Sequence, residues 1–228
     1  MRALWHKNRL DTDSAADYLV KNWVSFVEMS GDHIVEQHVH NIDVANWFIG
    51  HHPETALGFG GRLRRKTGNQ YDSFSVDYDY GDGCRIHSMC RQINGCYDRL
   101  GEEFLGTAGS MIGEGKVQNG RNVTVAEIGG HDDSSVQEHI DLLNSILSGA
   151  PMNGTKDVTE STMTAMMGRI SAYTGEIVRW SDLADNVDST WYNLSYSPSA
   201  EDFETGNVIL PAENVAPLPG AADDSADT

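Results

Sequence analysis

One segment of the chain carries polar side chains whose types and spacing could do chemistry. Glu36, His40, Asp43 and Trp47 stand at positions i, i+4, i+7 and i+11, and His33 precedes them. Residues spaced in this way share a narrow stripe on an α-helix. A carboxylate one turn before a histidine can orient the imidazole and favour its protonated form, so the ring can accept or return a proton near neutral pH. With an indole beside them, these groups suit a sugar-like or polyol substrate.

Plainer interpretations of this segment stay open at this point. A polar helix face is usually solvated rather than catalytic. His38 falls among the apolar residues of the same helix, where a histidine is more often a hydrogen-bonded core residue than a ligand. A zinc site would need His38 and His40 to reach one ion, yet residues i and i+2 of a helix point in nearly opposite directions. We therefore expect no metal ligand here, although a strand in place of the helix would restore a His-x-His zinc pair.

A second candidate surface follows a glycine-rich turn farther along the chain. One face of the expected strand there carries Arg85, His87, Met89 and Arg91. One face of such a strand must pack on helices, and the other can line a cleft or meet another subunit. Arg91 is therefore a candidate substrate contact. The alternative is that Arg85 and Arg91 pair with Asp77 or Asp79 across the hairpin.

The elements that must position these residues follow from periodicity and turn signals. Apolar residues recur at helical spacing over residues 14–29, 33–48, 134–147 and 157–173, and Asp32 is the expected cap of the second helix. Between the helices the period is two, and glycines separate short segments, which is typical of antiparallel strands. The expected strand segments are residues 56–65, 74–80, 84–93, 103–112 and 122–128. This order predicts an α+β fold with an open, mainly antiparallel β-sheet packed on helices.

Composition bounds the domain organisation and the classes of partner. The 228 residues predict one α+β domain over residues 1–197 and an acidic, proline-containing tail over 198–228. With 34 acidic and 16 basic residues the formal net charge is −18, which disfavours nucleic acid and membrane surfaces as partners. No apolar run predicts a membrane helix or a signal peptide, so the expected location of the chain as written is cytoplasmic. The three cysteines, six residues apart, match neither a disulfide framework nor a zinc site and are expected to be mostly buried thiols.

Several segments carry a resemblance to a known family. The first is GDHIVEQHVHNIDVANW at residues 31–47. The others are GFGGR at 58–62, SMCRQ at 88–92, QEHIDLLNSI at 137–146, ESTMTAMMGR at 160–169 and AYTG at 172–175. Over most of residues 10–185 the chain resembles the Gfo/Idh/MocA oxidoreductases, which include glucose–fructose oxidoreductase and inositol dehydrogenase. The resemblance implies the family's C-terminal α+β domain, whose open sheet shapes the substrate site and often joins subunits.

The resemblance also implies roles for residues of the first segment. The family's Asp-x-x-x-His element falls on Glu36 to His40, which implies that His40 transfers the proton and that Glu36 is its acidic partner or a substrate contact. Asp43 matches the acidic residue that follows this histidine. Glutamate at position 36 replaces the usual aspartate, which changes the reach of that carboxylate. The remaining candidates for substrate binding rest on position alone and are His33, Trp47 and Arg91.

A partner domain and a cofactor are implied as well. Family members join an N-terminal dinucleotide-binding domain to the C-terminal domain, and this chain is similar to the second half only. It contains no Gly-x-Gly-x-x-Gly that opens a helix after a strand, and no Glu-Lys-Pro, the family's cofactor-side lysine element. We therefore expect NAD or NADP in the complete enzyme and none bound by this chain alone. An uncovered apolar sheet face further predicts a homo-oligomer that assembles through the sheet.

Several functions are compatible with these features. The leading hypothesis is the substrate-binding and catalytic half of an NAD(P)-dependent oxidoreductase acting on a sugar, polyol or glycoside, with His40 taking a proton from a substrate hydroxyl. A close alternative is a glycoside-cleaving relative that works by transient oxidation and elimination. A non-catalytic sugar-binding or assembly module is a third hypothesis, and a zinc hydrolase is a fourth.

Overall fold

The chain divides into two compact units in its computed structural model. The structure describes residues 14–107, 109–112, 116–118, 130–186, 189 and 196–220. The first unit combines Met1–Leu100 with Glu160–Thr228, and the second is Gly101–Thr159. The candidate residues of the sequence all lie in the first unit, so its architecture decides which of them can act together.

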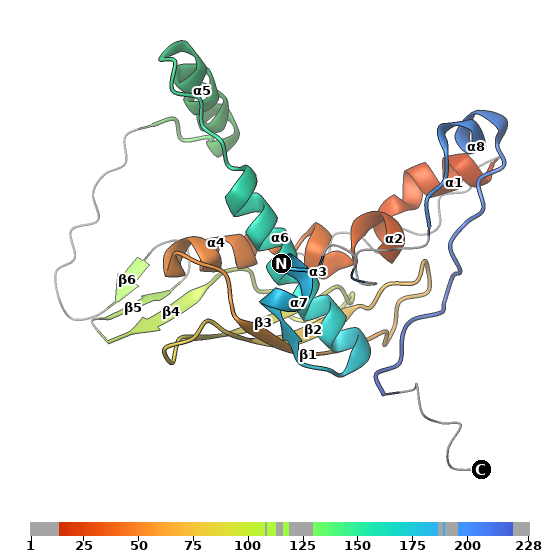
Figure 1. Cartoon of the computed structure of the whole chain (residues 1–228), viewed down its shortest axis with the longest axis horizontal. Helices are drawn as coiled ribbons and strands as arrows, with labels where there is room; N and C mark the ends of the chain where they lie inside the picture. Colours follow the sequence, from red (N-terminus) through yellow and green to blue (C-terminus); the bar gives the residue numbers. More distant parts are fainter. Residues whose placement is uncertain are drawn as a thin grey trace. The chain divides into compact units, whose positions relative to one another are not determined.

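A four-stranded antiparallel sheet is the main β element of the first unit (Figure 1). Its strands are β1 (Thr55–Gly61), β2 (Ser73–Asp79), β3 (Arg85–Arg91) and β7 (Val178–Arg179), in the order β3-β2-β1-β7. The turn between β2 and β3 has positive φ angles at Gly81, Asp82 and Gly83. Glycine adopts such angles without steric cost, which explains the two glycines of this turn. The predicted hairpin is thereby confirmed, with Asp79 opposite Arg85 and Ser73 opposite Arg91.

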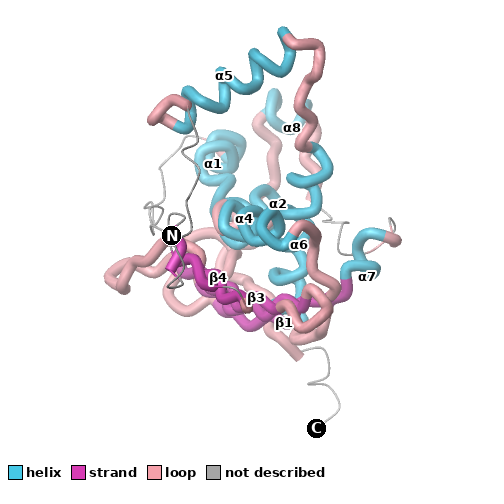
Figure 2. The backbone as a smooth tube through the Cα atoms, turned by 90° about the vertical axis from the view of Figure 1, so that its left-hand side faces the viewer, coloured by secondary structure: helices cyan, strands magenta, loops and turns pink. Residues whose placement is uncertain are grey.

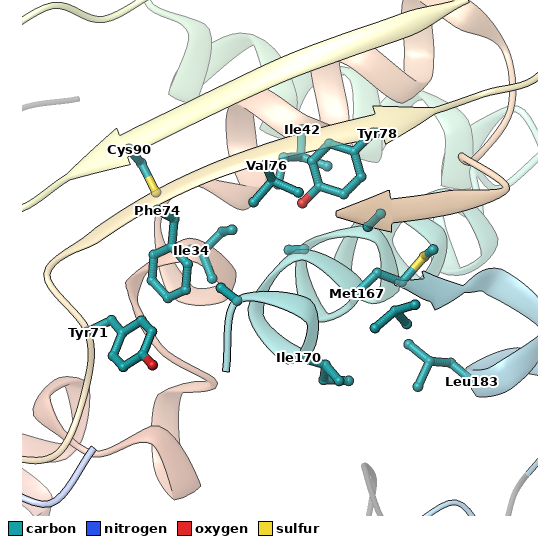
Figure 3. Close-up of a cluster of buried hydrophobic side chains, with 14 of the residues drawn as sticks. Ile34, Ile42, Tyr71, Phe74, Val76, Tyr78, Cys90, Met167, Ile170 and Leu183 are labelled. Carbon is teal, nitrogen blue, oxygen red and sulfur yellow. The ribbon is translucent and has the colours of Figure 1, made fainter. Parts of the chain in front are cut away.

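Helices cover one face of this sheet (Figure 2). They are α3 (His33–Glu36), α4 (Val39–Ile49) and the part of α6 (Thr155–Thr174) that belongs to the first unit, while the short α7 (Trp180–Ala184) follows β7. Their apolar sides and the inner face of the sheet form the main core (Figure 3). Its buried side chains include Ile34, Ile42, Phe74, Val76, Tyr78, Cys90, Met167 and Ile170. The predicted α+β fold, with an open antiparallel sheet packed on helices, is therefore confirmed.

Helix α6 approaches the sheet closely at two glycines. A Cβ atom added to Gly58 of β1 would lie 2.6 Å from the carbonyl oxygen of Gly168, and one added to Gly168 would overlap the hydroxyl of Tyr78. The backbone N–H of Gly58 also donates a hydrogen bond to Ser171 Oγ, at 2.8 Å. Side chains at these glycines would separate the helix from the sheet, so the two glycines set the spacing of the layers.

The helix predicted over residues 14–29 is divided into shorter pieces. These are α1 (Ala15–Asn22), the 3-10 turn η1 (Trp23–Ser25) and α2 (Val27–Ser30). The division has a clear cause in packing, because Phe26 adopts an extended backbone between the pieces and its side chain is fully buried. It enters a second, smaller core with Tyr18, Leu19 and Val208.

Residues 196–220, most of which the sequence assigns to a tail, pack against other parts of the first unit, to which they belong. They include the short helix α8 (Ala200–Thr205) and the buried Val208 of the second core. The Tyr71 hydroxyl donates to the Pro217 carbonyl oxygen at 2.5 Å. The N–H of Asn214 donates to the carbonyl oxygen of Gly68 at 2.8 Å. These contacts tie the segment to the loop between β1 and β2.

The second unit contains a small antiparallel sheet and a helix among its described residues. The strands are β4 (Glu103–Gly106), β5 (Gly109–Ile112) and β6 (Lys116–Gln118), in the order β4-β5-β6. Helix α5 (Ser134–Leu147) covers the span predicted for it and is capped by Asp133, whose carboxylate accepts a hydrogen bond from the Ser135 N–H at 2.9 Å. The strand expected at residues 122–128 lies outside the described residues.

Candidate active site

The helix predicted over residues 33–48 is broken in the middle of the candidate segment. Helix α3 ends at Glu36 and α4 begins at Val39. The N–H groups of both Gln37 and His38 donate to the carbonyl oxygen of His33, each at 3.0 Å, so the regular pattern from residue i to i−4 is interrupted. The expectation of one continuous helix is thus wrong, and the stripe inferred from 100° steps does not run across the break.

Three of the predicted site residues share the exposed side of α4. His40, Asp43 and Trp47 are exposed, and the exposed fraction of Trp47 is 77%. Their spacing of three and four residues within one helix places them on one face. Glu36 is the last residue of α3, before the break, and it is half-buried. Its side chain accepts a hydrogen bond from the Gln37 side-chain amide at 2.6 Å. The acidic and imidazole groups of this segment therefore come from two short helices.

A buried polar network fixes the orientation of α4 below this face. The Ser161 hydroxyl, on α6, donates to Asp43 Oδ1 at 2.6 Å. The side-chain amide of Asn46 donates to Thr164 Oγ1 at 3.2 Å, and its oxygen accepts a hydrogen bond from the Tyr80 hydroxyl at 2.7 Å. Sequence reasoning missed these partners, although Ser161 and Thr164 lie in the resembling segment at residues 160–169. The Asp43 side chain is therefore exposed to solvent, while its hydrogen bond with Ser161 holds the carboxylate in one orientation.

His33 does not share the exposed face. It is buried, with Nδ1 3.1 Å from Asp32 Oδ1 and Nε2 3.3 Å from Cys90 Sγ, and its ring lies against Phe74 with centroids 5.1 Å apart. Burial alone would lower the pKa of His33, but Cys90 and Asp32 together raise it to about 10. Its place at the first position of α3 turns it toward the sheet, so the structure separates it from the other candidates.

Asp32 is the cap expected at the start of this segment, and it is also the centre of a buried cluster. Its carboxylate accepts hydrogen bonds from the N–H of His33 at 2.5 Å, from the N–H of Tyr71 at 3.0 Å and from the Tyr173 hydroxyl. Burial would raise the pKa of Asp32, but the bonds and charge of His33 and the bonds from the two tyrosines lower it. Its backbone has φ 77° and ψ 162°, a region that is nearly restricted to glycine.

His38 confirms the expectation of a hydrogen-bonded core histidine. It is buried, and its Nε2 lies 2.7 Å from Ser88 Oγ on β3. Burial, together with the positive charge of His33, lowers the pKa of His38 to about 4. His38 and His40 therefore differ in environment, one facing the sheet and the other solvent.

The two buried histidines predict opposite dependences of stability on pH. The pKa of His38 falls from 6.5 to about 4 on folding. The stability that the neutral His38 side chain contributes is therefore present above pH 6.5 and is lost as the pH falls toward 4. The pKa of His33 rises from 6.5 to about 10 on folding. The stability that the protonated His33 side chain contributes is therefore complete below pH 6.5 and is lost as the pH rises toward 10.

Replacing His38 by glutamine is expected to reduce the loss of stability in acid. The glutamine amide can still hydrogen-bond with Ser88 but does not titrate, which removes a penalty of roughly 3 kcal/mol between pH 6.5 and 4. Urea unfolding of the wild-type chain and of His38→Gln at several pH values measures the difference. Parallel losses of unfolding free energy in the two proteins would contradict the assignment.

Arg91 lies on the outer face of the sheet, away from the helices. The alternation of β3 buries Cys90 and exposes Arg91, whose guanidinium donates to the Tyr97 carbonyl oxygen at 3.1 Å. Cross-strand pairing holds for Arg85, which forms an ion pair with Asp79 at 3.0 Å. Since α4 covers the inner face, the structure does not bring Arg91 together with the exposed residues of α4.

Two kinds of feature are absent from the part of the chain that the structure describes. Within them, no group of three or more histidine, cysteine or acidic side chains is arranged to hold a metal ion. Among the described helices, none is both long enough and apolar enough to cross a membrane.

Comparison with known proteins relates this architecture to others. A family model described as "Oxidoreductase family, C-terminal alpha/beta domain" matches residues 6–187. The aldose-aldose oxidoreductase from Caulobacter crescentus is 16% identical with a TM-score of 0.55, over 70% of this chain and 51% of that chain. The WlbA dehydrogenase from Bordetella pertussis, solved with NADH and UDP-GlcNAcA, is 15% identical with a TM-score of 0.52, over 72% of this chain and 50% of that chain.

The two solved structures are matched over a similar share of their length. The chain spans about half the length of the solved structures to which it is similar, and at such identities the similarity shows a shared fold. The comparison with curated protein sequences gave no match. The family model, in contrast, covers most of the chain, including α3, α4 and the four strands of the first sheet. The chain belongs to the Gfo/Idh/MocA oxidoreductase family, whose C-terminal α/β domain it carries.

Proposed function

We propose that this chain is the substrate-binding and catalytic half of an NAD(P)-dependent oxidoreductase that acts on a sugar, polyol or glycoside. The observation that carries the proposal is the exposed face of α4, where His40 and Trp47 flank an Asp43 carboxylate oriented by Ser161. A solvated helix face does not require a buried hydroxyl to orient one of its carboxylates. A binding face does, because an oriented group loses less freedom when substrate arrives.

Each group of this face has a task that fits a polyhydroxylated substrate. The His40 imidazole takes the proton from the hydroxyl that is oxidised, and it returns the proton in the reverse direction. The remaining lone pairs of the Asp43 carboxylate accept hydrogen bonds from neighbouring hydroxyls of the substrate. The Trp47 indole offers an apolar surface for the C–H groups of a sugar ring, and Glu36 supplies the acidic partner from α3.

The cofactor belongs to another domain in this proposal. A dinucleotide pyrophosphate binds at a glycine-rich turn that opens a helix. The nearest glycine-rich run of this chain, residues 58–61, lies within β1 and continues into a loop, so it does not fit that group. NAD or NADP, held by a dinucleotide-binding domain, would accept the hydride in the complete enzyme.

The test is an assay of a protein that joins this chain to a dinucleotide-binding domain. Hexoses, inositols, linear alditols and aryl glycosides are supplied with NAD or NADP, and reduced cofactor and free aglycone are both measured. The proposal expects reduced cofactor in proportion to oxidised substrate. Release of aglycone with unchanged cofactor would instead indicate elimination after transient oxidation, and binding without any conversion would indicate a binding module.

We also propose that the outer face of the first sheet joins two copies of the chain. Phe59 on β1 and Met89 on β3 are 66% and 68% exposed, and both lie opposite Ser75 of β2, so the three side chains form one row across the sheet with an apolar residue on each side of the serine. Large apolar side chains grouped on an open sheet are typical of an interface. We expect a second copy of the same face to cover these side chains, because a symmetric contact buries the apolar side chains of both copies at once.

Replacing Phe59 by aspartate is expected to shift the chain to monomer. A charge in the middle of a buried apolar interface costs several kcal/mol, which lowers the association constant by about a hundredfold or more. Sedimentation equilibrium of the wild-type chain and of Phe59→Asp measures the change. Val20→Asp, at an exposed position of α1, is the matched control and should leave the mass unchanged. A wild-type chain that is monomeric at every concentration would contradict the interface.

A further inference from the structure

Two aromatic side chains stand exposed at the C-terminal end of α4. The exposed fractions of Trp47 and Phe48 are 77% and 52%, and their rings meet edge to face with centroids 5.5 Å apart. This edge contact limits the orientations of the indole and leaves most of its surface open to solvent. An exposed indole held in this way offers a flat apolar surface on which a ring of a ligand can lie.

The backbone that carries this aromatic pair is fixed from the protein interior. Asn46, the residue before Trp47, is buried, and its side-chain amide donates to Thr164 Oγ1 at 3.2 Å. Its side-chain oxygen accepts a hydrogen bond from the Tyr80 hydroxyl at 2.7 Å. These partners come from α6 and from the residue after β2, so the last turns of α4 cannot rotate without breaking both bonds. Side chains carried by a rigid element keep their spacing when a ligand binds.

The exposed face of α4 is longer than one sugar ring. With a rise of about 1.5 Å per residue, Asp43 lies about 4.5 Å and Trp47 about 10.5 Å beyond His40 along the helix axis. The three side chains lie within about 60° of one another around that axis and all lean toward its N-terminus, so this spacing is kept. A pyranose ring is roughly as wide as one helical turn of 5.4 Å. A ring whose hydroxyls reach both His40 and Asp43 therefore leaves most of the Trp47 indole uncovered.

The charge of this face restricts the ligand further. Helices α3 and α4 contain no lysine or arginine, whereas Glu36 and Asp43 supply two carboxylates. A phosphate or carboxylate group of a ligand would meet like charge here and no lysine or arginine on these helices. The net charge of −18 acts in the same direction. The face therefore favours an uncharged ligand.

We propose that the substrate is an uncharged glycoside with two rings, an inference that rests on the function proposed above. The ring that is oxidised presents hydroxyls to His40 and Asp43. The second ring, an aromatic aglycone or a second sugar, lies flat on Trp47. A free hexose or an inositol covers only the first half of the face, and a linear alditol has no flat ring to set against the indole.

The first experiment compares ligands that differ only in the second ring. The 228-residue chain is titrated with the methyl and phenyl β-glycosides of glucose, galactose and mannose, and affinities are taken from the two-dimensional NMR shifts of residues 36–48. We expect the phenyl glycoside of the best-bound sugar to bind about tenfold more tightly than its methyl glycoside, because only the phenyl ring reaches Trp47. Cellobiose and lactose carry a second sugar instead, so they distinguish a sugar from an aromatic ring as the occupant of the indole.

A variant assigns this gain to the indole. Trp47→Ala should abolish the preference for the two-ring ligand and leave the affinity for the methyl glycoside within about twofold. Trp23→Ala is the matched control, since Trp23 is also exposed but belongs to η1, and it should keep the preference. Phenyl β-glucuronide, which adds a carboxylate to the first ring, should bind at least about threefold more weakly than phenyl β-glucoside.

Failure of this proposal can be told apart from failure of the proposed function. If one-ring and two-ring ligands shift α4 with equal affinity, or if Trp47→Ala weakens both equally, the two-ring substrate is overturned while the substrate face stands. Tighter binding of the glucuronide would overturn the uncharged class. A preference that is absent from kcat/KM of the protein joined to a dinucleotide-binding domain would show that the other domain covers Trp47, and would also overturn it. If no compound shifts residues 36–48, the substrate face itself is contradicted.

Discussion

Replacing His40 by asparagine is expected to lower kcat of the complete enzyme by about 10²- to 10⁴-fold, with a smaller change in KM. Asparagine can hydrogen-bond with a substrate hydroxyl but cannot take its proton at neutral pH. His40 is exposed on α4, so we expect the variant to fold as the wild-type chain does. Steady-state kinetics of the protein joined to a dinucleotide-binding domain measure the change.

The matched control for this prediction is another exposed histidine of the first unit. His51 follows α4 and its Nδ1 lies 2.8 Å from the His52 carbonyl oxygen, so His51→Asn should leave kcat within about twofold. A His40→Asn enzyme with nearly wild-type kcat would remove His40 from the mechanism. A large rise in KM alone would show that the residue binds substrate without transferring a proton.

Replacing Asp32 by alanine is expected to lower the free energy of unfolding by about 3–5 kcal/mol. The change leaves the buried His33 imidazolium, the Tyr71 N–H and the Tyr173 hydroxyl without the acceptor that now serves all three. Each such group lost its water on folding, so each is costly to leave unpaired. Urea unfolding at pH 7 measures the loss.

A glycine at the same position separates the carboxylate from the backbone. Asp32→Gly removes the same hydrogen bonds, but glycine adopts φ 77° and ψ 162° without strain. We therefore expect the glycine variant to be more stable than the alanine variant by about 1 kcal/mol or more. Equal stabilities of the two variants would show that the strain is absent, and a loss below about 1 kcal/mol in both would show that the cluster is not stabilising.

The sheet could be predicted from the sequence because its signals are local. Alternation of apolar and polar residues over 74–80 and the glycines at positions 81 and 83 specify two strands and the turn between them. The same alternation predicted that Cys90 and Arg91 face opposite sides of the sheet, as they do. Helix α5 was equally predictable from the helical spacing of its apolar residues.

The break between α3 and α4 could not be predicted, because contacts far apart in the chain cause it. His38 must reach Ser88, 50 residues later, and Asp43 is fixed by Ser161, 118 residues later. Placing residues at 100° steps assumes an uninterrupted helix, so it put His33 beside His40. The partners of Asp32 are also distant, which is why the sequence predicted a helix cap and missed the buried cluster.

The most direct measurement of the proposed substrate face is a two-dimensional NMR titration of the 228-residue chain with an inositol, a hexose and a linear alditol. Substrate on α4 should shift the backbone signals of residues 36–47 and the Trp47 indole N–H, and Asp43→Asn should weaken the response to the same compound. Shifts confined to other parts of the chain, or a response that Asp43→Asn leaves unchanged, would contradict the assignment of this face.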